Sequence, residues 1–148
     1  MIVLDTTVLI YAVSEGHSLR EPARRLVDAI DKQAVRATTT AEVIQEFAHV
    51  RAGRRTRQDA VRLAESYLDL LSPLLQVTAD DVRNGLGLFR RHTRLGSFDA
   101  VLAAAASAAG AEALVSADRS FASLEEPRHL DPGTAEFDRY LASLYPAG

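Results

Sequence analysis

Short apolar runs that end in polar residues recur along the chain and predict β-strands. Runs of this kind occupy residues 2–4, 34–39, 113–115 and 128–130. A further run at 73–77, PLLQV, is either a fifth strand or an extended connection. Runs of a few apolar residues bounded by polar ones are typical of strands buried in a sheet.

Between these runs, apolar residues recur three and four positions apart, which is the spacing of one helix face. Segments of this kind are 19–32, 40–53, 57–71, 79–92, 97–109 and 134–144. Strands that alternate with helices predict βαβ units and a mostly parallel sheet covered by helices. We therefore expect an α/β fold with a central sheet of four or five strands, in a single domain of residues 1–148.

The composition excludes several kinds of chemistry. The chain contains no cysteine, so thiol catalysis, disulfides and zinc sites built on thiolates are excluded. No apolar stretch approaches the roughly 20 residues that cross a bilayer, and the N-terminal run lacks the basic start of a signal peptide. We expect a cytoplasmic protein that does not bind a membrane.

Arginines are concentrated in two stretches, although the net charge is −3. Residues 51–57 read RAGRRTR, and residues 83–94 read RNGLGLFRRHTR. A local basic patch can contact nucleic-acid phosphates even on an acidic molecule. The alternative is that these arginines only form solvated helix faces. The candidates for RNA contacts are Arg51, Arg54, Arg55, Arg91 and Arg94.

Two acids directly follow predicted strands. Asp5 comes after the run at 2–4, and Asp118 comes shortly after the run at 113–115. In parallel sheets, functional groups gather at the carboxyl ends of the strands. Each acid also has an ordinary interpretation, Asp5 as a helix N-cap and Asp118 as a turn residue.

Two more acids lie in predicted helices. Glu46 borders the apolar stripe of the helix at 40–53 and is expected to be half-buried, whereas Glu42 lies further round toward solvent. Asp99 opens the Ala-rich helix at 97–109, with Ser97 as its expected cap and Phe98 on its apolar face. Each of these acids also has an ordinary interpretation. Glu46 alone could be a glutamate at the rim of the buried face that pairs with an arginine, and Asp99 could be a charge that complements the helix dipole.

Taken together, the four acids indicate a metal site. Carboxylates that converge at one sheet edge repel one another, which raises their pKa values or requires a cation. A ligand set made only of oxygen favours Mg²⁺ or Mn²⁺ over zinc. Such ions support phosphodiester cleavage by activating water and stabilising charge on the phosphate.

At these residues the chain resembles the PIN-domain nucleases, in particular the VapC-type toxins of VapBC toxin–antitoxin pairs. The resemblance is carried by MIVLDTTVLIYA, by TTTAEVIQEFAHVRAGR and by LGSFDAVLAAAASAAGAEALVSADRSF. It implies that Glu46, rather than Glu42, belongs to the site. Thr7 and Ser116 depart from the commoner family residues, but both keep a hydroxyl group.

The resemblance implies a three-layer α/β/α sandwich and an endoribonuclease that depends on Mg²⁺ or Mn²⁺. It also implies a homodimer and a small VapB-like antitoxin whose tail lies in a groove of the toxin. The expected metal ligands, direct or through water, are Asp5, Glu46, Asp99 and Asp118. The residues expected to orient these carboxylates or water are Thr6, Thr7 and Ser116.

Three other functions fit parts of the sequence. A PIN-domain nuclease can process RNA without being a toxin, and a PIN-like module can bind RNA or a partner without catalysis. An aspartyl phosphotransferase is a poorer match. Asp5-Thr6-Thr7 lacks the second aspartate that such a motif needs, and Lys32 is the only lysine.

Overall fold

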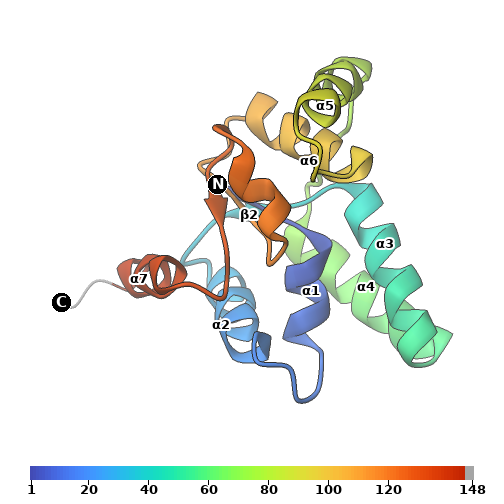
Figure 1. The fold of residues 1–148 in the computed structure, drawn as a ribbon. Helices are drawn as coiled ribbons and strands as arrows, with labels where there is room; N and C mark the ends of the chain where they lie inside the picture. The colour runs from blue at the N-terminus through green and yellow to red at the C-terminus, as the bar shows by residue number, and fades with distance from the viewer. Residues whose placement is uncertain (146–148) are drawn as a thin grey trace.

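A parallel four-stranded sheet forms the centre of the computed structural model, which describes residues 1–145 (Figure 1). The strands are β1 (Ile2–Leu4), β2 (Ala37–Thr38), β3 (Ala113–Val115) and β4 (His129–Leu130), in the order β2-β1-β3-β4. Every residue of β1 and β3 is buried, as expected for inner strands with both faces covered. This arrangement confirms the predicted α/β fold and its parallel sheet.

Helices fill the connections between the strands, and all the predicted helical segments are found with small changes at their ends. They are α1 (Thr6–Ala12), α2 (Arg20–Asp31), α3 (Ala41–Arg54), α4 (Arg57–Leu71), α5 (Ala79–Arg91), α6 (Ser97–Ala108), the 3₁₀ helix η1 (Arg119–Ser123) and α7 (Ala135–Ser143). In the part of the chain that is described, no helix has the length and apolar character needed to cross a membrane.

Two of the expected strands are shorter in the structure or absent from it. The segment 73–77 contributes only one bridge, between Leu75 and Thr40, and Pro73 has no N–H to donate to a neighbouring strand. The run at 34–39 shrinks to β2 because Ala34 still bonds back to the end of α2. At its other end, the Thr39 hydroxyl donates to the Leu4 carbonyl, at 2.7 Å.

Threonine hydroxyls determine where four of the helices begin. Each accepts a hydrogen bond from the backbone N–H of the third helical residue, the usual N-cap arrangement. These caps are Thr40, Thr56, Thr78 and Thr134. The prediction that Ser97 caps α6 is wrong. Gly96 occupies the N-cap position of α6, and Ser97 is the first residue of the helix.

The helices α5 and α6 pack as a close pair, at the top of Figure 1. A run of buried alanines on α6, from Ala103 to Ala106, lets this helix approach its neighbours closely. On α5, a Cβ atom placed on Gly85 would lie 2.6 Å from the Cα of Val101. The pair therefore depends on the absence of a side chain at this position.

We expect Gly85→Ala to destabilise the fold by about 1–3 kcal/mol, because the new methyl group overlaps backbone atoms of α6. Gly87→Ala is the matched control on the same helix. There the Cβ would meet only the end of the Arg91 side chain, at 3.4 Å, so a gain of about 0.5–1 kcal/mol from helix propensity is expected. Urea denaturation measures both, and equal effects would contradict the close packing.

Candidate active site

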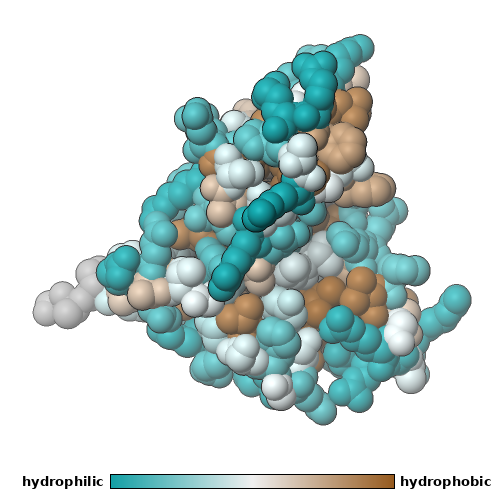
Figure 2. Space-filling model, in the orientation of Figure 1, coloured by the Kyte–Doolittle hydropathy of each residue, from teal (hydrophilic) through white to brown (hydrophobic). Residues whose placement is uncertain are grey.

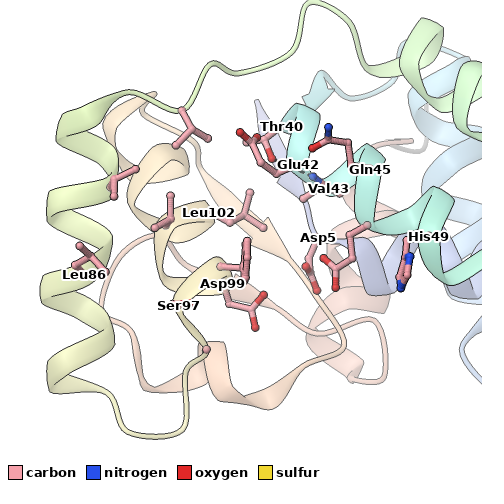
Figure 3. A pocket seen from close by; sticks show the side chains of 16 residues that line it. Asp5, Thr40, Glu42, Val43, Gln45, His49, Leu86, Ser97, Asp99 and Leu102 are labelled. Atoms are coloured by element: carbon pink, nitrogen blue, oxygen red, sulfur yellow. Dashed lines mark hydrogen bonds between the residues drawn. The ribbon is translucent and has the colours of Figure 1, made fainter.

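A groove of about 830 Å³ opens between α3 and the α5–α6 pair (Figure 3). Three of the four predicted acids line it: Asp5, Glu46 and Asp99. In Figure 3 the carboxylates of Asp5 and Asp99 point into the same space. Much of the lining contributed by α5, α6 and the segment before α5 is apolar, with Val77, Val82, Leu86, Phe98, Val101 and Leu102. The fold thus brings residues from distant parts of the sequence to one cavity.

Asp5 stands at the N-cap position of α1, but its carboxylate is held by hydroxyl groups and does not cap the helix. Its side chain makes no capping bond to α1, and its Oδ2 atom accepts from Ser116 Oγ at 2.6 Å and from Thr7 Oγ1 at 3.0 Å. The residue is only 4% exposed. Burial raises the pKa of Asp5, and the bonds from Ser116 and Thr7 partly oppose that rise.

The hydroxyls that hold Asp5 also connect the ends of neighbouring strands. Ser116 Oγ accepts from the Asp118 backbone N–H at 3.0 Å, and Thr7 Oγ1 accepts from the Ala117 N–H at 3.0 Å. The Ser116 carbonyl lies 2.8 Å from His129 Nε2. Because a carbonyl only accepts, this ring nitrogen carries a proton. The carboxyl ends of β1, β3 and β4 therefore form one hydrogen-bonded unit.

Glu46 reaches the same region from α3. Its Oε2 atom accepts from Thr6 Oγ1 at 2.7 Å, and Thr6 itself is buried. Glu46 is exposed, so the expectation of half-burial is wrong: one turn of α3 faces the open groove at this point. Glu42 also lines the groove, but Glu46 accepts the bond from Thr6 and its charge raises the pKa of Asp99.

Asp99 shows that the acids share one electrostatic environment. Partial burial raises the pKa of Asp99 to about 7, and the charges of Asp5, Asp118 and Glu46 add to the rise. A carboxyl group in ordinary water has a pKa near 3.8. Asp99 is therefore close to half-protonated at neutral pH unless a positive charge enters the groove.

Asp118 lies at the edge of this arrangement. It is not among the residues that line the groove. Its Oδ1 atom accepts from the Ser120 backbone N–H at 2.9 Å, at the start of η1. The turn role considered from the sequence is therefore present, and Asp118 influences the groove through its charge on Asp99.

The donor set fits a hydrated divalent cation better than a tightly bound one. Within residues 1–145, no three carboxylate or imidazole groups are close enough together to bind one metal ion. Four carboxylates nevertheless line one groove, and the charges of two of them, Asp5 and Glu46, raise the pKa of Asp99. Mg²⁺ keeps several of its waters and is usually bound by one or two carboxylates, so the remaining acids would act through water.

The arginines expected to contact RNA differ in their availability. Arg51 donates to Asp59 Oδ2 at 2.6 Å and to the Val13 carbonyl at 3.3 Å, and its side chain is only 15% exposed. Arg51 therefore holds α3 against α4, which corrects its expected role in RNA binding. Arg55 makes an exposed ion pair with Glu15, and such pairs contribute little.

The other three candidates, Arg54, Arg91 and Arg94, are exposed. No carboxylate in residues 1–145 forms an ion pair with them. Their contact with RNA stays a prediction.

Several groove residues were not expected from the sequence. Gln45 and His49 line the groove from α3, and His49 lies close to one helical turn beyond Glu46, which is the signal that places them on one side of the helix. Phe98 was expected on the buried face of α6 but is 82% exposed. It stands in the first turn, where the helix extends past its packed neighbours.

The parallel sheet, with acids at its carboxyl edge and a groove beside them, is the arrangement of a PIN domain. The PIN-domain family matches residues 2–127, and the chain belongs to that family. Ribonuclease VapC7 of Mycobacterium tuberculosis is 51% identical over 139 residues, which cover 91% of this chain and 94% of that protein.

Solved structures have the same fold. The sarcin-ricin-loop-cleaving toxin VapC20 of Mycobacterium tuberculosis superposes with a TM-score of 0.69 at 23% identity, covering 86% of this chain and 99% of that one. A chain of VapBC2 from Rickettsia felis, bound to a DNA fragment from its promoter, superposes with a TM-score of 0.68 at 16% identity. The superposition covers 88% of this chain and 98% of the VapBC2 chain.

The raised pKa of Asp99 predicts how stability depends on pH when no metal is present. In the unfolded chain the pKa returns to about 3.8, so between about pH 4 and pH 7 only the folded protein keeps this proton. The folded state binds more protons in that window, and its free energy of unfolding falls as the pH rises through it.

We therefore expect Asp99→Asn in EDTA to melt roughly 2–8 °C above the wild type at pH 8, the response to a change of about 1–2 kcal/mol. Near pH 4 the two proteins should melt together. Asp69→Asn, at an exposed position of α4, is the control and should shift the melting temperature at neither pH. A wild-type advantage at pH 8 would contradict the repulsion among these acids.

Proposed function

We propose that this protein is a metal-dependent endoribonuclease that cleaves RNA phosphodiester bonds. The observation that carries the proposal is the raised pKa of Asp99, which partial burial and the charges of Asp5, Glu46 and Asp118 produce together. Such an excess of negative charge in a groove is useful when a cation enters with the substrate. A rigid set of hydroxyls holds the acids ready, so little reorganisation is needed on binding.

In this proposal Asp5 and Asp99 hold Mg²⁺ or Mn²⁺, with Glu46 and Asp118 contributing through water. When bound, the ion makes water more acidic and neutralises charge on the phosphate. Thr7 and Ser116 fix the orientation of the Asp5 carboxylate, and Thr6 does the same for Glu46.

Metal binding would also require Asp99 to be ionised. Since its pKa is about 7 in the free protein, metal affinity should rise with pH through neutrality.

The proposed biological role is that of a toxin in a type II toxin–antitoxin pair, in the cytoplasm. The extensive identity with Ribonuclease VapC7 supports this role, and the fold shared with VapBC2 supports a VapB-like antitoxin as the partner. We also propose a homodimer, on the grounds of the family alone. An RNA-processing role would require the same chemistry but no antitoxin.

A catalytically inactive RNA-binding or partner-binding module is the second candidate. The exposed apolar side of the groove fits a binding module as well as an enzyme. The two candidates differ in one result, which is whether purified protein cleaves RNA when Mg²⁺ or Mn²⁺ is added and stops when EDTA removes it.

Mapping of cleavage ends in total RNA after induced expression tests the function directly. The wild type should produce new, discrete 5′ ends. Asp99→Ala should reduce them at least about a hundredfold, since loss of groups that only orient metal ligands already costs about 10–100-fold in metal affinity or activity. Asp69→Ala should cleave like the wild type.

The fold of each variant must be verified by circular dichroism and melting temperature. Normal cleavage by a folded Asp99→Ala protein would remove Asp99 from the site. If the wild type produced no metal-dependent RNA cleavage ends, the protein would be better described as a binding module.

A further inference from the structure

Phe98 is the most exposed of the large apolar residues that the structure describes. It is 82% exposed, whereas the next, Val61, is 54% exposed. Phe98 contributes nothing to the core, although it stands in a helix whose following residues are mostly buried. Together with the exposed Val82 and Leu86, Phe98 gives the groove an apolar patch, and such a patch marks an interaction site.

The position of Phe98 is closely tied to the acidic site. It directly precedes Asp99 in the first turn of α6, and both residues line the same groove. A molecule that brings a phosphate to Asp5 and Asp99 therefore enters the groove that Phe98 also lines. Figure 2 shows further apolar side chains gathered over the α5–α6 pair.

The segment that leads into α6 is strongly basic. Arg90, Arg91 and Arg94 are all exposed, and none forms an ion pair with a carboxylate of residues 1–145. The loop of residues 92–96 joins α5 to α6, so these charges lie at the same end of the helix pair as Phe98. An exposed aromatic ring thus stands between a basic segment and a cluster of acids.

This combination matches a nucleotide better than a protein segment. Bases stack on aromatic side chains while arginines contact the flanking phosphates, and the stacking tolerates any sequence. A base can do this only when it is unpaired, because a duplex keeps its bases stacked inside. The centre of a protein–protein interface, in contrast, is depleted in charged residues.

We propose that Phe98 stacks on the base of an unpaired nucleotide next to the scissile phosphate, and that Arg94 contacts the neighbouring phosphate. This inference rests on the proposed ribonuclease function and names the residues that hold the nucleotide beside the scissile phosphate. It also separates the acids, which act on the phosphate, from Phe98, which positions the nucleotide. Phe98 is therefore a substrate-binding residue whose loss weakens binding without removing the acidic site.

The test is binding of a short single-stranded RNA that carries 2-aminopurine, measured in EDTA so that binding is separated from cleavage. Stacking on Phe98 should quench the fluorescence of this base analogue. Phe98→Ala should abolish the quenching and raise Kd about 5- to 150-fold, the range for loss of one base–aromatic stack. Phe98→Trp, which keeps a stacking surface, should stay within about threefold of the wild type.

Phe89→Ala is the matched control, because Phe89 is 46% exposed on α5 but does not line the groove. It should bind and quench like the wild type. Arg94→Gln should weaken binding. It should also make the plot of log K against log salt less steep, by the amount expected for the loss of about one phosphate contact. A fully paired duplex should show neither the quenching nor the dependence on Phe98.

Two results would overturn the proposal. One is wild-type binding and quenching by Phe98→Ala. The other is a lower molecular mass of Phe98→Ala in sedimentation equilibrium, which would assign Phe98 to an interface between copies of this chain.

These failures are distinct from failure of the ribonuclease function. If the wild type cleaves RNA with metal while Phe98→Ala binds normally, only the stacking role is lost. Quenching that depends on Phe98 without any metal-dependent cleavage would instead support a binding module.

Discussion

Mutual repulsion among carboxylates is the interaction on which this structure's function depends. Partial burial and, after it, the charges of Asp5, Asp118 and Glu46 raise the pKa of Asp99 to about 7. The fold tolerates this cost because the acids stand on a rigid frame at the carboxyl edge of the sheet. A positive charge in the groove would remove the repulsion, so the residues that repel one another would favour a bound cation.

The frame is built from hydroxyl groups rather than from ion pairs. Ser116 and Thr7 hold Asp5, and Thr6 holds Glu46. Threonine caps begin α3 and α5, two of the helices beside the groove. Neutral donors orient a carboxylate without cancelling its charge, whereas an arginine in the same place would. Arg51 illustrates the contrast, since it pairs with Asp59 on the far side of α3 from this chemistry and stabilises the packing of helices.

Local pattern predicted the strands β1 and β3 and all the longer helices, because apolar periodicity and threonine caps are properties of neighbouring residues. It also placed Asp5 and Asp118 at the carboxyl edge of the sheet, because parallel strands end there. Glu46 and Asp99 were assigned to the same site from their helix positions and from the resemblance to the PIN family. It did not predict the exposure of Phe98 or Glu46, which depends on where α3 and α6 extend past their neighbours. Nor did it show that Arg51 already forms an ion pair, because its partner Asp59 lies on another helix. The short β2 likewise reflects tertiary contacts of Thr39, not its β-branched sequence.

The central claim is that a divalent cation binds among these carboxylates. A crystal of the protein soaked in Mn²⁺ at pH 8, with an anomalous difference map, tests it directly. The account predicts a peak between the Asp5 and Asp99 carboxylates, with water between the ion and at least one of the other acids. Mn²⁺ bound only elsewhere on the molecule, with no peak in this groove, would contradict it.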